Sequence, residues 1–288
     1  MTSRDFSPVA SVVIPAHNEG RSIAACLAPL VSEASGLPLE IVVAANGCTD
    51  DTAAVARHFS GVTVLEVPEP SKTGAMNAAD QVASCFPRFY LDADVCLDRE
   101  AIHGLVEALT TSEPRLAAPG VRHDTAGADV LVRHFYAMYR LLPSSAGTAV
   151  GRGVYGLSCA GRARFDTFPP VQGDDLFVNR LFTPSETVLT RGTSTVRTPR
   201  RWTTLVKVRS RVAQGNARLA KDRSGQLGTL ARTHDFAPTT GSTVRALIRL
   251  VRQRPSRLPS AVTYASLTLI ARAHRTDHRT WQRDDSTR

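Results

Sequence analysis

Apolar runs of strand length alternate with stretches of helical periodicity over the first 120 residues or so of the chain. The runs predict strands, and the stretches between them show the apolar spacing of three and four residues that is typical of amphipathic helices. The predicted strands are Ser11–Pro15, Leu39–Ala44, Val62–Val67, Phe89–Leu91 and Leu116–Pro119, and the predicted helices are Gly20–Glu33, Thr49–Phe59, Thr73–Cys85 and Asp98–Thr111. This alternation predicts an α/β protein with a mainly parallel, doubly wound sheet.

Polar or conformationally restricted residues stand where the predicted strands end. Pro15 ends the first strand, Asn46 follows the second, and Asp92 follows the fourth. In doubly wound sheets, ligands bind outside the carboxyl ends of the strands. The pattern therefore predicts that these positions line one ligand-binding crevice.

The alternation gives way to a looser pattern after about residue 128. We expect a helix at Asp129–Leu142, a glycine-rich segment at Gly147–Gly161, an acidic turn at Gln172–Leu176 leading into a helix that ends at Phe182, a short strand at Glu186–Thr190, and then helices at Thr203–Arg223, Thr243–Gln253 and Leu258–His274. The last part of the chain is therefore expected to be helical.

Asp92 and Asp94 are separated by a single residue directly after an apolar run. Side chains two positions apart leave the end of a strand on the same side. Two carboxylates can bind a hard divalent cation such as Mg²⁺ or Mn²⁺ and leave coordination positions open for phosphate oxygens. In this context the pair indicates an enzyme that neutralises a departing diphosphate with a metal ion.

The net charge of +9 is divided unevenly along the chain. Residues 1–190 hold 14 Lys and Arg against 21 Asp and Glu, a net charge of −7, whereas residues 191–288 hold 21 against 5, a net charge of +16. A basic segment of this kind suits phosphates, nucleic acid or an anionic membrane. Its aromatic residues are widely scattered, which argues against nucleic acid as a partner.

The cysteines and the apolar segments limit the possible cellular locations of the protein. The five cysteines are odd in number and lack C-x-x-C spacing, which argues against a disulfide framework and a zinc site. The first residues lack the apolar region of a signal peptide. No stretch approaches the roughly 18 apolar residues of a membrane span. We therefore expect a protein in the cytoplasm or at the inner face of a membrane.

Five segments resemble, in their order and spacing, the motifs of the inverting glycosyltransferases of family 2, which have the GT-A fold. They are Val12–Glu19, Val43–Thr52, Lys72–Asn77, Asp92–Asp94 and Gly173–Leu176. The resemblance covers residues 11 to about 182 and implies a hexosyltransferase-like enzyme that moves a sugar from a nucleoside diphosphate sugar to an acceptor hydroxyl. It also implies a catalytic domain over residues 1–190, with a nucleotide-sugar half up to about residue 120 and an acceptor half over residues 121–190. Residues 191–288 would form a basic helical extension.

The resemblance implies donor-binding roles for residues in the first four motifs, namely Pro15, Ala16, Glu19, Asn46, Lys72, Asp92 and Ala93. Glu19 would accept hydrogen bonds from a ribose or a base, although a carboxylate here also suits the dipole of the following helix. Lys72 would stabilise phosphate charge, and Asp92 and Asp94 would hold Mg²⁺ or Mn²⁺. Asn46 stands where the family commonly carries an acidic residue that contacts uracil, so the base of the donor stays open.

The pair Asp174 and Asp175 resembles the family's carboxylate pair at the start of a helix, whose Asp is the general base for the acceptor hydroxyl. The leading residue is Asp rather than the more usual Glu. Adjacent carboxylates repel each other, which raises one pKa toward the useful range. The register leaves either residue as the base, and a helix N-cap is the non-catalytic alternative.

Processive members of the family carry a Gln-x-x-Arg-Trp motif after the base. Here only Arg201 and Trp202 match its last two positions, so the resemblance implies a non-processive enzyme. These residues suit either an acceptor or phosphate group or a solvated basic face. The glycine-rich segment Gly151–Gly156 lacks the ending of a phosphate-binding loop and is interpreted as the lip of the acceptor site.

The helices predicted after residue 243 combine apolar positions with Arg245, Arg249, Arg252, Arg254 and Arg257. Such a surface can rest on anionic lipid near a lipid-linked acceptor, or it can be a helix face in water beside a small glycoside acceptor. Two other functions remain as alternatives. One is a nucleotidyltransferase acting on sugar phosphates, which would usually carry a Gly- and Arg-rich loop after the first strand. The other is a protein that binds nucleic acid or an anionic surface through the basic tail.

Overall fold

The computed structural model describes residues 7–31, 35–142, 149, 151–171, 173–221 and 240–273. The predicted residues Gln172, Arg223 and His274, and part of the glycine-rich segment, lie outside this range. An eight-stranded sheet forms the centre of the molecule, in the order β3-β2-β1-β4-β7-β6-β8-β5. The strands are β1 Ala10–Ala16, β2 Leu39–Asn46, β3 Val62–Val67, β4 Arg88–Leu91, β5 Val95–Leu97, β6 Leu116–Asp124, β7 Val154–Leu157 and β8 Thr187–Arg197.

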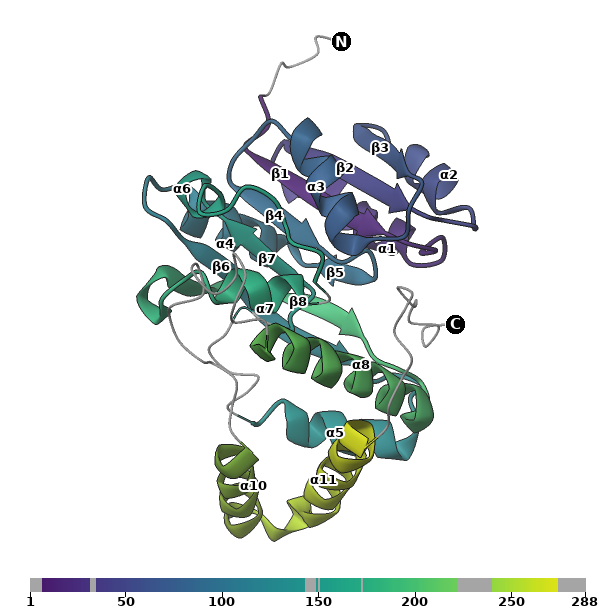
Figure 1. Cartoon of the computed structure of the whole chain (residues 1–288), viewed down its shortest axis with the longest axis vertical. Coiled ribbons are helices and arrows are strands. Elements are labelled where there is room, and N and C mark those ends of the chain that lie inside the picture. The colour runs from purple at the N-terminus through teal and green to yellow at the C-terminus, as the bar shows by residue number, and fades with distance from the viewer. Residues whose placement is uncertain are drawn as a thin grey trace.

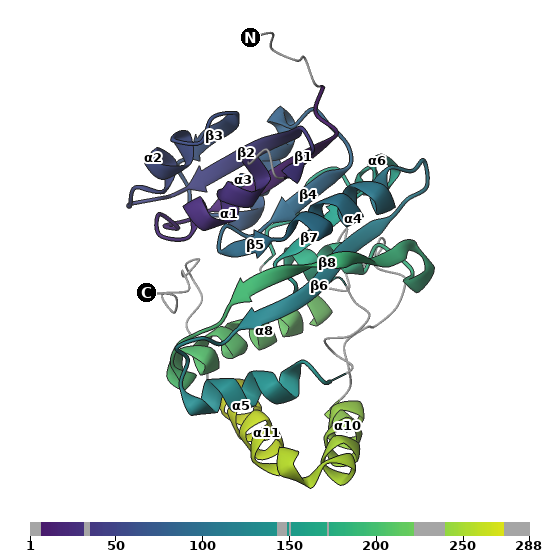
Figure 2. The ribbon, with the colours of Figure 1, turned by 180° about the vertical axis from the view of Figure 1, so that it is seen from behind.

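Helices cover both faces of the sheet (Figures 1 and 2). Those in the first two thirds of the chain are α1 Ile23–Val31, α2 Thr52–Arg57, α3 Lys72–Val82, α4 Arg99–Leu109, α5 Val130–Tyr139, α6 Cys159–Arg162 and α7 Asp174–Asn179. Val12 and Ile14 of β1 pack with α1 and α4 on one face, whereas Val13 packs with α3 on the other. Because both faces of β1 are buried, this central strand is mostly apolar rather than alternating.

The first half of the sheet has the predicted parallel pairing, with β2 between β3 and β1 and β4 beside β1. The second half is mixed: β7 runs antiparallel to both β4 and β6, β8 runs parallel to β6, and β5 runs antiparallel to β8. The short strands β5 and β7 were not predicted. The predicted strand Glu186–Thr190 is only the start of β8, so the expected division at residue 190 falls inside a strand of the sheet.

The sheet bends between β4 and β5. Only the three residues 92–94 join these strands, and four residues of extended chain reach about 14 Å from Leu91 to Val95. In the strand order, β7, β6 and β8 lie between β4 and β5, so a flat sheet would hold these two strands about 19 Å apart. This distance is longer than the connection can reach, so the sheet must bend. The bend brings the turn at residues 92–94 across the middle of the molecule.

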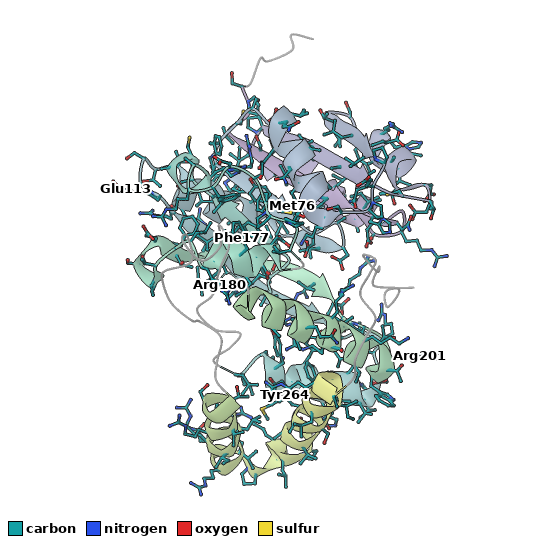
Figure 3. The ribbon with its side chains drawn as sticks, viewed as in Figure 1. Met76, Glu113, Phe177, Arg180, Arg201 and Tyr264 are labelled. Atoms are coloured by element: carbon teal, nitrogen blue, oxygen red, sulfur yellow. The ribbon has the colours of Figure 1, made fainter. Side chains whose placement is uncertain are left out.

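The C-terminal helices form a second layer beyond the sheet (Figure 1). They are α8 Trp202–Lys221, α10 Thr240–Gln253 and α11 Leu258–Ala273. These helices bury Leu205, Leu250 and Tyr264 in one apolar cluster with Phe135 of α5. Tyr264 stacks on Phe135 with ring centroids 5.0 Å apart, and Figure 3 shows it between α5 and α11. The basic extension therefore packs on a helix that belongs to the predicted acceptor half.

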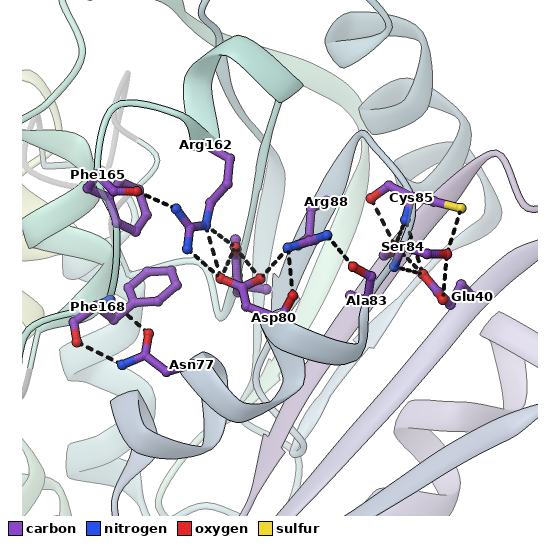
Figure 4. A network of polar contacts seen from close by, with 12 residues as sticks. Glu40, Asn77, Asp80, Ala83, Ser84, Cys85, Arg88, Arg162, Phe165 and Phe168 are labelled. Carbon is purple, nitrogen blue, oxygen red and sulfur yellow. Dashed lines mark hydrogen bonds and ion pairs between the residues drawn. The ribbon is translucent and has the colours of Figure 1, made fainter.

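A buried polar network fixes α3 to the sheet (Figure 4). The Asp80 carboxylate accepts from Arg88 at 2.8 Å, from Arg162 at 2.9 Å and from the Tyr90 hydroxyl at 2.9 Å. One turn earlier, the Asn77 side chain exchanges two hydrogen bonds with the backbone of Phe168. Because a buried carboxylate without partners would be costly, this network holds α3 in one position.

Candidate active site

The carboxyl ends of β1 and β2 are joined by Asn46. This residue is 1% exposed, and its side-chain amide donates to the Ala16 carbonyl at 2.8 Å. Pro15 and Ala16 are likewise buried in β1. Among the described residues, the Asn46 Oδ1 atom is one of the few buried polar side-chain atoms with no hydrogen-bond partner. Asn46 thus links the carboxyl ends of β1 and β2 and holds a buried acceptor without a partner there.

Glu19 lies in the loop between β1 and α1, four residues before α1 begins. Its backbone N–H donates to the Thr52 hydroxyl at 2.7 Å, and its carboxylate accepts from the Ser22 hydroxyl. The neighbouring Asn18 has a φ of 55° and accepts from the backbone N–H of Thr49 at 2.7 Å. These bonds tie the loops after β1 and β2 together at the crevice.

Lys72 is the first residue of α3 and lies between two carboxylates. Its Nζ is 2.7 Å from Asp92 Oδ1 and 2.8 Å from Asp174 Oδ1. Burial alone would lower the pKa of Lys72, but the two carboxylates outweigh it and raise the pKa above its usual range. Lys72 therefore stays charged and joins two acidic motifs that lie about eighty positions apart in the sequence.

The turn at residues 92–94 is fixed from behind by the glycine-rich segment. The Asp92 N–H donates to the Gly153 carbonyl at 2.8 Å. Gly153 has a φ of 68°, and a Cβ there would lie 2.4 Å from a methyl group of Val95. Only glycine fits this position, so the segment interpreted as the lip of the acceptor site also supports the acidic turn.

Asp92 and Asp94 leave the turn partly exposed, with Ala93 buried between them. The Asp92 side chain is 40% exposed beside Lys72. No group of three or more His, Cys, Asp or Glu side chains within the described ranges is arranged to hold a metal ion. Two partly exposed carboxylates fit a hard cation that takes its remaining ligands from diphosphate oxygens and water.

Asp174 opens α7 and is almost fully buried. One of its oxygens contacts Lys72, and the other accepts from the Tyr155 hydroxyl at 3.2 Å. Burial raises the pKa of Tyr155, so the phenol stays a hydrogen-bond donor. Both oxygens of Asp174 are thereby used within the protein.

Asp175 is more exposed than Asp174 and accepts the Gly151 N–H at 2.7 Å. Loss of hydration, followed by the charge of Asp174, raises its pKa to about 6. The two adjacent carboxylates therefore differ: Asp174 is held in an ion pair, whereas Asp175 can exchange a proton near neutral pH.

Arg201 and Trp202 are not brought to these carboxylates. They stand at the start of α8, where the backbone N–H of Trp202 donates to Asp129 Oδ2 at 2.7 Å. Trp202 is 39% exposed. In Figure 3, Arg201 lies at the edge of the molecule, away from Phe177 of α7. No contact among the described residues supports their predicted acceptor role, which stays a prediction.

No individual role was predicted from the sequence for Tyr155, Gly151 or Asn18, although the first two lie in the segment interpreted as the lip of the acceptor site and Asn18 lies in the first motif. Tyr155 lies on β7, a short strand without the alternation that reveals half-buried strands. Asn18 adopts the left-handed conformation that Asn tolerates better than most residues, which is a signal that only the structure reveals.

A comparison with protein families gives this geometry its context. The family described as "Glycosyl transferase family 2" matches residues 11–161, which is more than half of the chain. The chain belongs to glycosyltransferase family 2. Membership in this family bears out the resemblance and favours a glycosyltransferase over the nucleotidyltransferase alternative.

A relative that is named as a glycosyltransferase matches part of the chain. The 4,4'-diaponeurosporenoate glycosyltransferase of Staphylococcus aureus (strain MRSA252) is 29% identical over 169 residues, which are 56% of this chain and 42% of that protein. The chain thus matches less than half the length of this relative. In addition, no helix in the described part of the chain is long and apolar enough to cross a membrane.

Two solved structures share the fold. A mannosyltransferase from Pyrobaculum calidifontis, in complex with GDP-Man and Mn²⁺, superposes with a TM-score of 0.63 at 20% identity, over 93% of this chain and 87% of that one. Glucosyl-3-phosphoglycerate synthase from Mycobacterium tuberculosis, in complex with Mn²⁺, UDP and glucosyl-3-phosphoglycerate, superposes with a TM-score of 0.53 at 21% identity, over 73% of this chain and 78% of that one. The predicted GT-A fold is confirmed.

Proposed function

We propose that this family 2 protein is a metal-assisted, inverting glycosyltransferase that moves one sugar from a nucleoside diphosphate sugar to an acceptor hydroxyl. The observation that carries the proposal is the bridge formed by Lys72, which lies within 2.8 Å of both Asp92 and Asp174. A reaction between a donor and an acceptor needs the donor-binding groups and the base in one site. The bridge supports that arrangement.

The donor is assigned to the crevice at the ends of β1, β2 and β4. Asp92 and Asp94 would hold Mg²⁺ or Mn²⁺, and the bound cation would supply charge neutralisation for the departing diphosphate. Glu19 would contact the nucleoside, and the buried Asn46 would fix the ends of β1 and β2 beside it. The two solved neighbours hold different nucleotides, GDP-Man and UDP, so the proposal covers the nucleoside diphosphate and leaves its base open.

Asp175 is the proposed general base. Its pKa of about 6 makes it mostly ionised yet able to take a proton at neutral pH, and it is more exposed than its neighbour. Asp174 would act as a positioning residue, because both of its oxygens are already bound by Lys72 and Tyr155. This assignment decides between the two carboxylates that the sequence left open.

In the proposed step, the acceptor oxygen attacks the anomeric carbon from the face opposite the diphosphate. A new carbon–oxygen bond forms, and the bond from the anomeric carbon to the diphosphate oxygen breaks. The leaving diphosphate takes the electron pair, and the Asp175 carboxylate takes the acceptor proton. Lys72 stabilises negative charge beside the departing group. Attack from the opposite face inverts the anomeric configuration.

The acceptor is proposed to be a hydroxyl of a small glycoside or of a lipid-linked molecule, and the reaction is placed in the cytoplasm. The 4,4'-diaponeurosporenoate in the relative's name refers to a protein that this chain matches over only part of its length. The proposal therefore takes from that relative the class of reaction and not the acceptor.

The test is a thermal-melt screen of the full chain against UDP-, GDP- and dTDP-sugars, with and without Mn²⁺. The proposal predicts that at least one nucleotide sugar raises the melting temperature, and that EDTA removes most of this effect. Transfer of the sugar from the stabilising donor to trial glycosides would then be measured through the release of the nucleoside diphosphate. If the nucleotide sugars give equal or no stabilisation with and without metal, the metal-assisted donor site is overturned.

A further inference from the structure

The outer surface of α10 and α11 has features that the proposed reaction does not use. These helices form the end of the molecule opposite β3 and α2 (Figures 1 and 2). Residues 240–273 contain six arginines and no aspartate or glutamate. Within the described ranges, none of the arginines of α10 forms an ion pair with a carboxylate. Among the residues that the structure describes, no carboxylate neutralises the positive charge of the α10 arginines.

Exposed aliphatic side chains lie between these arginines. On α10, Val244 and Ile248 are each 47% exposed, beside the exposed Arg245 and Arg249. The opposite side of the same helix buries Leu250 in the apolar cluster. Because a helix turns about 100° per residue, the exposed residues share one outer side. A basic face that only needed solvation would have little use for large aliphatic residues there.

α11 repeats the pattern without arginines in its middle. Leu258, Val262 and Leu269 are 53%, 55% and 64% exposed and follow one side of the helix. The other side of α11 buries Tyr264 and Leu267 against α5 and α8. Two neighbouring helices thus present uncovered aliphatic groups while their inner sides complete a core. We call Arg245, Ile248, Arg249, Arg252, Val262 and Leu269 the α10–α11 face.

We propose that the α10–α11 face docks on an anionic lipid bilayer. Guanidinium groups would contact lipid phosphates, and the aliphatic side chains would enter the boundary between the headgroups and the acyl chains. Arg245, Ile248, Arg249, Arg252 and Gln253 line a shallow hollow of about 520 Å³, which suits a phosphate headgroup. The helices would lie on the surface rather than cross it.

Charge and side-chain type favour lipid over nucleic acid as the occupant. Nucleic acid would use the arginines but gain little from exposed valine, isoleucine and leucine. Single strands are usually bound by exposed aromatic rings. Tyr264, the aromatic residue of α10 and α11, is buried. A bilayer interface is the partner that accepts both positive and aliphatic groups.

The experiment measures co-sedimentation of the full chain with phosphatidylcholine vesicles, with and without phosphatidylglycerol, at low and high salt. We expect binding to the anionic vesicles, weakening as salt rises, and little binding to neutral ones. The combined variant Arg245→Gln, Arg249→Gln and Arg252→Gln should weaken binding by on the order of a hundredfold, at about fivefold per arginine. The matched control removes the same charge elsewhere through Arg57→Gln, Arg122→Gln and Arg191→Gln, and should bind nearly as the wild type does.

A second variant tests the aliphatic part of the face. Ile248→Gln, Val262→Gln and Leu269→Gln replace exposed residues, so a thermal melt should show a fold like that of the wild type. This variant should lose the binding to anionic vesicles that survives at high salt. The proposal is overturned if the wild type ignores anionic vesicles at low salt. It is also overturned if the aliphatic variant binds as the wild type does and duplex DNA competes with the vesicles equally.

Vesicle binding is independent of the proposed reaction. The Asp175→Asn variant should bind vesicles as the wild type does, because α7 is not part of the α10–α11 face. A failure of vesicle binding would leave the donor site standing, and a failure of donor binding would leave the lipid face standing.

Discussion

The two acidic motifs of the site look alike in the sequence and differ in the structure. Asp92 and Asp94 lie on a turn between two strands, where the Asp92 side chain is 40% exposed. Asp174 and Asp175 open a helix, and the Asp174 side chain is only 6% exposed. Partly exposed carboxylates suit a cation, whereas loss of hydration and the neighbouring charge of Asp174 raise the pKa of Asp175, which suits proton transfer. The surroundings of the carboxylates, more than the residue type, therefore suit the two motifs to different proposed roles.

The largest effect should come from removing the proposed base. Asp175→Asn should lower turnover by about two to four orders of magnitude, the usual contribution of a positioned general base. Donor affinity should change little, because the amide keeps the shape of the side chain. Steady-state kinetics and donor titration would measure both. Asp166→Asn, an exposed aspartate of the preceding loop, is the matched control. Full activity of the Asp175 variant would assign the base elsewhere.

Removing a carboxylate of the acidic turn should weaken metal-dependent donor binding, in contrast to the loss of turnover expected for Asp175→Asn. Asp94→Asn should weaken donor binding in Mn²⁺ by more than about tenfold, because a charge-bearing metal ligand is lost. The affinity that remains in EDTA should be unchanged. Isothermal titration with and without metal would separate the two values. Glu113→Gln, at an edge of the molecule far from α3 in Figure 3, should leave both unaltered. Equal losses with and without metal would argue for a purely structural role of Asp94.

The pH dependence should distinguish the two carboxylates of the helix pair. The pKa of Asp175 is raised to about 6, and the base must be ionised to act, so kcat/KM should fall about tenfold per pH unit below pH 6 and level off above it. Asp174→Asn removes a charge that raises this pKa and should move the midpoint to lower pH. A pH–rate profile of both proteins tests this. A midpoint that moves upward would contradict the proposed coupling.

The smallest effect is expected at Tyr155, which only orients Asp174. Tyr155→Phe removes one hydrogen bond of 3.2 Å and should cost about 1 kcal/mol of unfolding free energy. Turnover should fall only a few-fold, with the metal dependence of donor binding intact. A thermal melt and initial rates would measure these changes. A loss as large as that of the Asp175 variant would make Tyr155 itself a catalytic residue.

Local sequence patterns predicted the parallel half of the fold well. β1 and β2 are mostly apolar runs, and β3 is an edge strand with exposed Thr63 and Glu66. Pro15 and Asn46 lie at the carboxyl ends of neighbouring strands. The mixed half of the sheet was harder to predict from the sequence. β5 has three residues and β7 has four, too few to show a period, and their pairing depends on contacts distant in sequence. The predicted α/β fold with a mainly parallel sheet is confirmed, but the sequence did not locate the antiparallel pairs.

The candidate site was predicted to a similar extent: local motifs named single residues but not the contacts between distant segments. Asp92, Asp94, Asp174, Asp175 and Lys72 could be named from their motifs, yet nothing local indicated that Lys72 would touch carboxylates from two of them. That contact depends on the buried position of α3, which the network around Asp80 maintains. The choice between Asp174 and Asp175 likewise depended on hydrogen bonds from Tyr155 and Gly151, which no spacing rule contains.

The three-residue connection between β4 and β5 has a consequence for how the chain can be divided. Because residues 92–94 bridge strands from opposite parts of the sheet, the first 120 residues do not form a separable module. Cutting after them would leave β4 without β7 and β5 without β8. The acidic turn thus connects two parts of the sheet that can form only together.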